Sequence, residues 1–423
     1  MALEAFFCCP QSVSRLQNGP LATFVEGFLD FLLKSGFSHY TTQKHLGYLS
    51  HLAAYLHAVN PKHRDKITTK EVELFYQEYA ISCRHRSSVE KHLLDVRHSI
   101  NRFIDYLDKS DLFERQDNHY PFQDILRAYL NWMRDHQHAS SGTLKIREHG
   151  IRQFLDWLGT KKISASLVGI NVDIIEEFFL IYSQRKDIGR AARRSMQSAL
   201  RTFLRFCFQK KYIDQQLDQA VPTLRTYKLS TVPRGLTESQ AQKVLDAIDR
   251  SNFVGLRDYA ILQLLSTYGV RGGQIRALSL EDIHWQNNQI LFRALKNGKD
   301  ILLPLTSNVG QSLINYLQKA RPTCMFPEVF LTSRAPYRPF IHSNALSAIV
   351  DRRIRAADIK IHSQGAHAFR HGLATRLINN GHAVKDIADI LGHRHLSTTF
   401  IYTKVDFNTL KQVALEWPTE EQL

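Results

Sequence analysis

A histidine and an arginine three residues apart, His367 and Arg370, have the chemistry that a reaction on phosphate requires. The surrounding segment AHAFRHGLATRLINNG indicates a helix, in which residues three apart project from one face. An arginine neutralises charge that develops on phosphate oxygens, and a histidine exchanges a proton near neutral pH. The pair therefore predicts a site for phosphoryl transfer.

A metal site is the competing interpretation of the same segment. His367 and His371 have the i,i+4 spacing of two ligands on one helix face. The His-Glu-x-x-His signature is missing, however, and no carboxylate lies between the two histidines. We therefore expect no metal here.

A second cationic centre is expected in the segment TYGVRGGQIRALSLEDI, where Arg271 lies in a Gly-rich turn after a helix. The planar guanidinium of an arginine pairs with two phosphate oxygens at once. Further along, an Asn-Gly turn between two apolar runs, Gln289–Arg293 and Asp300–Pro304, predicts a β-hairpin. Lys296 and Lys299 lie in that turn, where an ammonium group can reach a DNA strand.

The segment DILGHRHLSTTFIYTKVD supplies a candidate nucleophile. His393 follows the glycine that ends an apolar helix, and Tyr402 comes nine residues later. A phenol has a pKa of about 10 and is a poor nucleophile at neutral pH. It becomes useful where cations stabilise the transition state and a base takes its proton. Taken singly, each of these residues is equally well explained as part of an ordinary surface or core.

In order, spacing and context, these segments together resemble the tyrosine recombinase (phage integrase) family over most of residues 235–405. The family has an arginine ahead of a Leu-x-x-x-Asp-Ile run, a His-x-x-Arg box, and a Leu-Gly-His, Ser-Thr-Thr, Tyr series. This chain departs from the family at Gln274, where a glutamate is frequent, and at Ala366, where a proline is frequent.

The resemblance implies a role for each residue. Arg271 and Arg370 hold the non-bridging oxygens, and Tyr402 attacks the phosphate. His393 adds a hydrogen bond and His367 helps to deprotonate the tyrosine. A hairpin lysine protonates the leaving 5′ oxygen, and counting back from Leu-Pro-Leu favours Lys296 over Lys299. The implied catalytic set is Arg271, Lys296, His367, Arg370, His393 and Tyr402.

The same resemblance implies a site-specific DNA recombinase that works through a 3′-phosphotyrosine without metal, cofactor or ATP. Such enzymes act as tetramers on two double-stranded DNA sites, and some need partner recombinases. The tail Lys404–Leu423 has apolar residues at helical steps and is expected to dock on its own domain or on a neighbouring subunit.

The composition agrees with a polyanionic partner. The net charge is +15, which suits nucleic acid or an anionic membrane surface. No run approaches the roughly 20 apolar residues of a membrane span. The five cysteines form no Cys-x-x-Cys pair, and the N-terminus lacks the features of a secretion signal. We therefore expect a soluble cytoplasmic protein associated with the nucleoid.

The first half of the chain looks duplicated. Phe28–Leu56 parallels Tyr129–Leu158, and His92–Leu107 resembles Arg193–Phe208. Apolar residues recur at helical steps in all four segments, which predicts two helical bundles in tandem. With the hairpin, the expected fold is mainly α with a small antiparallel sheet.

Four regions follow from this pattern: an N-terminal helical (SAM-like) domain at 1–115, a core-binding domain at 116–221, a linker at 222–235 and a catalytic domain at 236–423. The first domain is expected to bind further DNA, to contact partner subunits or to brace the second. Between residues 185 and 211 nine basic residues face one acid, which suits a helix along phosphates. The predicted DNA-contacting residues are Arg190, Arg193, Arg194, Arg201, Arg225, Lys228 and Lys299.

Three other functions remain open at this point. A type IB topoisomerase uses the same tyrosine chemistry but relaxes DNA as a monomer. A DNA-binding relative that has lost catalysis would lack some of the polar set, and a nuclease would need metal.

Overall fold

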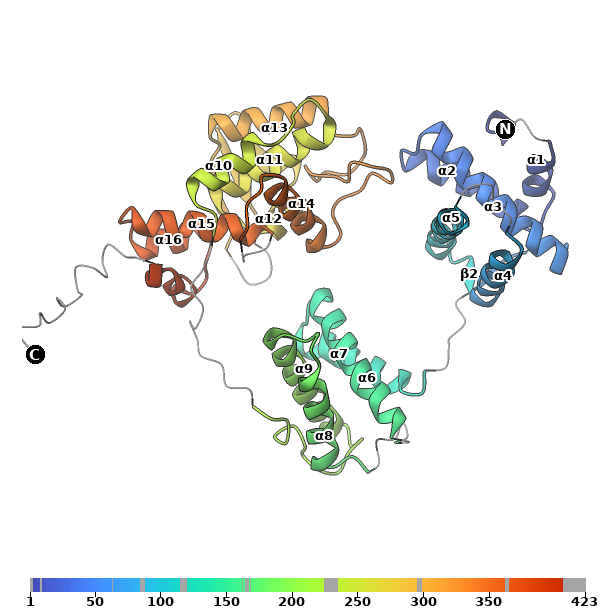
Figure 1. The fold of residues 1–423 in the computed structure, drawn as a ribbon, viewed down its shortest axis with the longest axis horizontal. Coiled ribbons are helices and arrows are strands. Elements are labelled where there is room, and N and C mark those ends of the chain that lie inside the picture. The colour runs from blue at the N-terminus through green and yellow to red at the C-terminus, as the bar shows by residue number, and fades with distance from the viewer. Residues whose placement is uncertain are drawn as a thin grey trace, which may run out of the picture. The chain divides into compact units, whose positions relative to one another are not determined.

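The computed structural model describes residues 3–7, 10–62, 64–83, 88–114, 120–161, 163, 167, 169–223, 235–294, 299–361 and 365–405. The described chain is mainly helical with two small sheets (Figure 1). It divides into two compact units, one of residues 115–228 and one that contains residues 1–114 and 229–423. Across the described residues, no helix is both long and apolar enough to cross a bilayer.

The N-terminal part, residues 3–114, is a helical bundle with its own apolar core. A short parallel pair joins β1 (Ile67–Thr68) to β2 (Phe113–Glu114). The helices are η1 (Leu3–Ala5), α1 (Pro10–Gln17), α2 (Ala22–Lys34), α3 (His39–Val59), α4 (Thr69–Ser82) and α5 (Val89–Lys109).

The middle part, residues 120–223, is a second bundle with a separate core that is rich in aromatic side chains. Tyr129, Phe154, Phe203 and Phe206 are fully buried at its centre, as expected for helices with one apolar face. Its helices are α6 (Gln123–Gln137), α7 (Ser141–Thr160), α8 (Val172–Gln184) and α9 (Arg190–Gln209).

The two bundles begin their second long helix in the same way. Ser38 caps α3 by accepting a hydrogen bond from the Thr41 amide, and its hydroxyl also pairs with the Thr41 hydroxyl at 2.9 Å. Ser140 caps α7 through the same two contacts with Thr143, with the hydroxyls 3.0 Å apart. Such a cap contributes about 1 kcal/mol to helix stability. A shared cap at matching positions is what a duplicated bundle requires.

The C-terminal part, residues 235–405, combines helices with one three-stranded sheet. Antiparallel pairing joins β3 (Ile283–His284), β4 (Gln289–Phe292) and β5 (Ile301–Pro304), so the expected hairpin is confirmed. The helices are α10 (Glu238–Asp246), α11 (Phe253–Tyr268), α12 (Gly272–Ala277), η2 (Leu280–Asp282), α13 (Ser307–Lys319), α14 (Ser343–Ala356), α15 (Ala366–Asn379), α16 (Val384–Leu391), η3 (Leu396–Thr398) and η4 (Phe400–Val405).

Helix α11 is the centre of this part. Most of its residues are buried, and it packs against α13 and α15 (Figure 1). The helix ends at Gly269, whose φ of +58° lies in the left-handed region that glycine adopts without strain. A Cβ at this position would come within 2.8 Å of Leu373. The glycine therefore allows the turn that leads directly to Arg271.

The apolar run Val329–Thr332 has the composition of a further strand, but the structure forms none there. This segment makes only isolated bridges, Ser279 with Glu328 and Leu331 with Pro339. The reason is that irregular backbone and side chains together satisfy its backbone groups, because the Val329 and Thr332 amides donate to the Leu278 and Arg338 carbonyls. The guanidinium of Arg321 donates to the carbonyls of Glu328 and Val329, so no neighbouring strand is needed.

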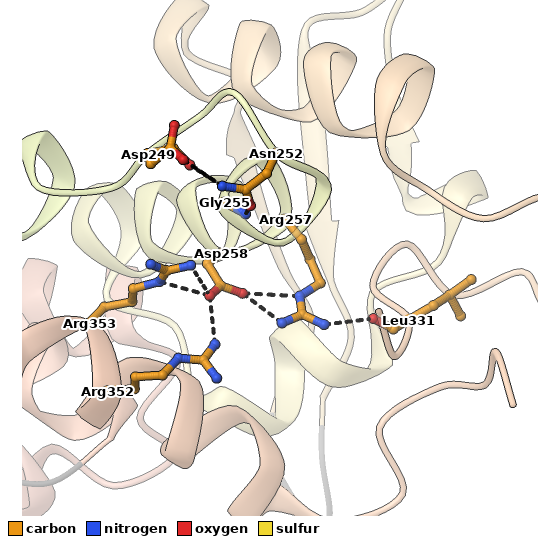
Figure 2. Close-up of polar contacts among 8 residues, drawn as sticks. All are labelled: Asp249, Asn252, Gly255, Arg257, Asp258, Leu331, Arg352 and Arg353. Carbon is orange, nitrogen blue, oxygen red and sulfur yellow. Dashed lines mark hydrogen bonds and ion pairs between the residues drawn. The ribbon is translucent and has the colours of Figure 1, made fainter. Parts of the chain in front are cut away.

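An ion cluster links α11 to α14 inside this part. The carboxylate of Asp258 is fully buried and accepts hydrogen bonds from Arg257, Arg352 and Arg353 (Figure 2). One oxygen takes both contacts from Arg257, the shorter at 2.7 Å, and the other takes Arg352 at 2.9 Å and Arg353 at 2.7 Å. The cluster ties the central helix to the segment that precedes α15.

Candidate active site

Two arginines from different segments form the floor of the candidate site. Arg271 precedes the first turn of α12, and its Nη1 donates to the carbonyl of Gly392 at 3.2 Å. Arg370 lies in α15 and is only 3% exposed. Its two Nη atoms donate to the carbonyls of Gly269 and Leu391, each at 2.8 Å. These backbone contacts hold both guanidinium groups in fixed orientations.

Gln274 supports Arg271 through the backbone. Its side-chain oxygen accepts a hydrogen bond from the Arg271 amide at 3.0 Å. A glutamate in this position offers the same acceptor with an added charge. The departure from the family pattern therefore keeps the turn in place and leaves the guanidinium of Arg271 free of a neighbouring carboxylate at this residue.

The two guanidinium groups interact electrostatically because they share a poorly solvated region. Burial first, and then the charge of Arg271, lowers the pKa of Arg370 to about 10. Burial also lowers the pKa of Arg271. Both groups remain charged at neutral pH, so the site holds two cations that repel each other. A bound anion would offset this repulsion. A phosphodiester is an anion of suitable size and geometry.

Tyr402 lies beside these cations in η4, which packs on α15. The side chain is 2% exposed and packs with Leu373, Ile378 and Leu391. Its hydroxyl is 2.8 Å from Nδ1 of His371. Burial raises the pKa of Tyr402, although Arg370 and Arg271 act in the opposite direction. The phenol therefore keeps its proton at neutral pH.

His393 and His367 complete the group. His393 follows α16, and its Nδ1 is 2.7 Å from the hydroxyl of Thr399. Burial, followed by the charges of Arg370 and Arg271, lowers the pKa of His393 to about 4. Burial and the same two arginines also lower the pKa of His367. Both imidazoles are therefore neutral at pH 7 and able to donate one hydrogen bond each.

The structure thus brings five of the six predicted catalytic residues into one region of the C-terminal part. Lys296 lies outside the described residues. Lys299, the alternative lysine, is exposed just before β5.

The predicted DNA-contacting residues of the middle part differ in their surroundings. Arg190 and Arg194 are exposed near the start of α9, and Arg193 is half-buried. Arg201 instead donates to the Val221 carbonyl at 2.7 Å and to the Thr223 hydroxyl at 2.6 Å. These contacts hold the end of the bundle in place, so Arg201 has a structural role. Arg225 and Lys228 lie outside the described residues.

His371, which the sequence indicated only as a possible metal ligand, has a contact that sequence reasoning missed. It touches the hydroxyl of Tyr402, the position that was assigned to His367. The two imidazoles are stacked one helical turn apart, with centroids 5.8 Å from each other. Their i,i+4 spacing was visible in the sequence, but it does not tell which of the two faces a tyrosine from another element.

Comparison with known proteins agrees with this arrangement. The model of the phage integrase family matches residues 234–409. A putative integrase/recombinase, y4rA of Sinorhizobium fredii, is 30% identical over 419 residues, which cover 97% of this chain and 98% of the relative. Tyrosine recombinase XerC of Pelotomaculum thermopropionicum is 29% identical over 300 residues, 67% of this chain and 94% of that protein.

Among solved structures, the site-specific recombinase XerH, bound to a palindromic difH substrate in a post-cleavage complex, has the same fold. The TM-score is 0.54 at 18% identity, and the match covers 82% of this chain and 94% of XerH. The fold and the clustered polar residues define an enzyme of the tyrosine recombinase class. The chain belongs to the phage integrase family.

Proposed function

We propose that this protein is a site-specific DNA recombinase that cleaves and rejoins DNA through a 3′-phosphotyrosine at Tyr402. The observation that carries the proposal is a buried tyrosine whose hydroxyl contacts His371, the residue that follows the buried Arg370 in α15. The y4rA and XerC names and the recombinase–DNA complex of XerH support it.

In the proposed reaction, Arg271 and Arg370 bind the two non-bridging oxygens of the scissile phosphate. They stabilise the charge that grows as the Tyr402 oxygen bonds to phosphorus. His393 adds a hydrogen bond to the same phosphate. A hairpin lysine, Lys296 or its alternative Lys299, protonates the leaving 5′ oxygen. Nothing in these roles requires a metal ion or a cofactor.

Rejoining needs no ATP in this scheme. A phosphotyrosine bond is similar in energy to the phosphodiester that it replaces, so the reverse attack by a 5′ hydroxyl restores the DNA. We propose a tetramer acting on two double-stranded sites, with or without partner recombinases, and with the tail Lys404–Leu423 docked in cis or in trans. The proposed location is the cytoplasm, on the nucleoid.

The proposed domain roles follow the chain: an accessory bundle at 1–115, a core-binding bundle at 116–221, a linker at 222–235 and a catalytic domain at 236–423. Charge supports this division of roles. Residues 1–114 contain 13 basic and 13 acidic residues, whereas residues 115–228 contain 19 and 11. Most long-range attraction to DNA is therefore expected from the later domains.

Helix α9 has an unusual charge arrangement that fits phosphate contact. Arg190 and Arg194 are exposed near its N-terminus, and its first turn has no acid. Positive side chains are unfavourable at this end of a helix because the macrodipole is also positive there. An anion bound at this end interacts favourably with both.

Charge reversal at α9 is therefore expected to weaken DNA binding. Arg194→Glu should lower the affinity for duplex DNA about tenfold or more, because one charge-assisted phosphate contact is lost and a repulsion added. The slope of log affinity against log salt should fall by about 1. Lys91→Glu, near the start of α5 in the neutral first bundle, is the matched control. Equal losses in both variants would contradict the assignment.

A library of nicked duplexes of random sequence tests the main proposal. Cleavage near the nick releases a short fragment and traps the protein on the DNA. We expect an SDS-resistant adduct in EDTA and without ATP, with the DNA joined through its 3′ phosphate to the tryptic peptide that contains Tyr402. An adduct on the 5′ side, or cleavage that requires a divalent metal, would refute the mechanism.

The DNA trapped in this adduct also distinguishes a recombinase from a type IB topoisomerase. Duplexes recovered from the adduct are expected to share a sequence, and two copies of that sequence should yield a four-way junction. Relaxation of a plasmid without any such shared sequence, and without a junction, would favour a type IB topoisomerase.

A further inference from the structure

His371 occupies the position next to the nucleophile. Its Nδ1 lies 2.8 Å from the Tyr402 hydroxyl, and the two rings are 5.6 Å apart at their centroids. His367 lies one turn earlier on α15 and stacks on the His371 ring, with the centroids 5.8 Å apart and the planes at 28°. Among the contacts of the described residues, the one to the Tyr402 hydroxyl comes from His371.

The protonation states fix the direction of this hydrogen bond. Burial, followed by the charges of His367 and Arg370, lowers the pKa of His371 to about 4, so its imidazole is neutral at pH 7. The pKa of Tyr402 is raised, so the phenol keeps its proton. The hydroxyl then donates to Nδ1, and the other nitrogen carries the imidazole proton. This is the ground-state arrangement of a base and the acid that it deprotonates.

Bound phosphate would make His371 a stronger base. The groups that face it are His367 and Arg370 on its own helix, Tyr402 in η4 and His393 after α16. In the free site, Arg370 disfavours a proton on His371. A phosphodiester held by the two arginines offsets this positive charge, and its own negative charge favours imidazolium. Basicity therefore increases when substrate is in place.

We propose that His371, rather than His367, accepts the proton of Tyr402 during attack. The inference rests on the proposed recombinase function. As the bond from the Tyr402 oxygen to phosphorus forms, the phenol proton moves to Nδ1 of His371. The bond from phosphorus to the 5′ oxygen breaks, and that oxygen takes a proton from the hairpin lysine. In rejoining, the 5′ hydroxyl attacks phosphorus and gives its proton back to the hairpin lysine, while the bond from phosphorus to the Tyr402 oxygen breaks and that oxygen takes the proton from His371.

The experiment measures the rate of covalent adduct formation on the nicked duplex that the wild-type protein selects. His371→Ala is expected to slow adduct formation about 10²–10⁴-fold, the usual contribution of a general base. Added imidazole should restore part of the rate, because it can enter the space left by the side chain. DNA affinity should be unchanged. His367→Ala is the matched control, and imidazole should not accelerate it.

A second variant separates proton transfer from positioning. His371→Asn places an amide oxygen near the position of Nδ1, so it can accept the same hydrogen bond but cannot take the proton. We expect it to bind DNA normally and to be about as slow as His371→Ala. A rate within about threefold of wild type would overturn the proposal, as would imidazole rescue of His367→Ala in place of His371→Ala.

A wrong recombinase mechanism and a wrong role for His371 would give different experimental results. If the wild-type protein forms no adduct at Tyr402, the recombinase mechanism itself is wrong. If the wild type forms the adduct and both His371 variants form it at the same rate, only the role of His371 is wrong.

Discussion

Replacement of Tyr402 by phenylalanine is expected to abolish the covalent protein–DNA adduct while leaving DNA affinity within about twofold of wild type. The ring is 2% exposed and packs with Leu373 and Leu391, and phenylalanine keeps those contacts. The variant removes only the oxygen that forms the bond to phosphorus. Adduct formation and DNA binding, measured on the same nicked duplex, report the two effects separately.

The cost of this substitution to folding should be modest. Removing the hydroxyl leaves Nδ1 of His371 without its donor, a loss of about 1 kcal/mol because the imidazole is only half-buried and water can replace the donor. A small fall in thermal stability is the expected side effect. Persistence of the adduct in Tyr402→Phe would place the nucleophile elsewhere and invalidate the mechanism derived above.

Much of the C-terminal part was predictable because its signals are local. A threonine three residues before a glutamine is a local signal for a helix start, and the Thr237 hydroxyl accepts a hydrogen bond from the Gln240 amide at the start of α10. The hairpin between Gln289 and Pro304 followed from an Asn-Gly turn and two apolar runs. Helix caps and tight turns depend on a few adjacent residues, so they can be identified without knowledge of tertiary contacts.

The assignment between His367 and His371 depends on contacts that lie far apart in the sequence. Tyr402 comes from a short helix 31 residues beyond His371. A helical pattern predicts that both histidines share a face, but the rotation of α15 relative to η4 is set by packing around Leu391 and Ile378. The sequence therefore predicted an imidazole beside the tyrosine and assigned it to His367, whereas the structure places His371 there.

The role of Arg201 likewise depends on contacts that local sequence does not reveal. Its place in a run of basic residues predicted DNA contact, since a run of one sign suits phosphates. In the folded bundle its guanidinium reaches the backbone of Val221, and the nearby Arg205 pairs with the buried carboxylate of Asp218 at 2.9 Å. Composition cannot distinguish an arginine that is free to bind DNA from one whose guanidinium is bound to other residues of its own bundle.

The Asp258 cluster is a feature that no sequence motif indicated, and it carries the largest expected effect on stability. Arg257 lies next to Asp258 in α11 and is 6% exposed, whereas Arg352 and Arg353 come from α14, 94 and 95 residues later. Figure 2 shows the three guanidinium groups directed at one carboxylate. A single buried negative charge thus pairs with three positive ones, of which Arg257 is 6% exposed, Arg353 18% and Arg352 53%.

Burying Arg257 and most of Arg353 in this way is stable only while the carboxylate is present. Charges removed from water are costly unless they are paired and hydrogen-bonded. Arg257 also donates to the Leu331 carbonyl at 3.4 Å and lies 5.6 Å from the Phe340 ring, but neither contact compensates its charge. The outer member, Arg352, is 53% exposed and can turn towards solvent if its partner is lost. Arg257 and Arg353 have less freedom to do so.

Asp258→Asn is therefore expected to destabilise the C-terminal part by about 3–5 kcal/mol, the usual cost of removing one partner from a buried ion pair. Asparagine has nearly the same shape, so the loss isolates the charge. Asp249→Asn is the matched control, because Asp249 is exposed and accepts its hydrogen bonds from Ser251 and Asn252 at the turn before α11 (Figure 2).

Native-state hydrogen exchange of the α11 and α14 amides measures this loss directly, because it reports the opening of these helices without requiring the whole chain to unfold in one step. Protection should fall in both helices in Asp258→Asn and stay near wild type in Asp249→Asn. Helix α14 is the helix before α15, which carries His367 and Arg370. Loosening α14 should therefore also disturb these two residues and slow adduct formation. Equal protection in the two variants would mean that apolar packing, rather than the carboxylate, holds α14 against the central helix.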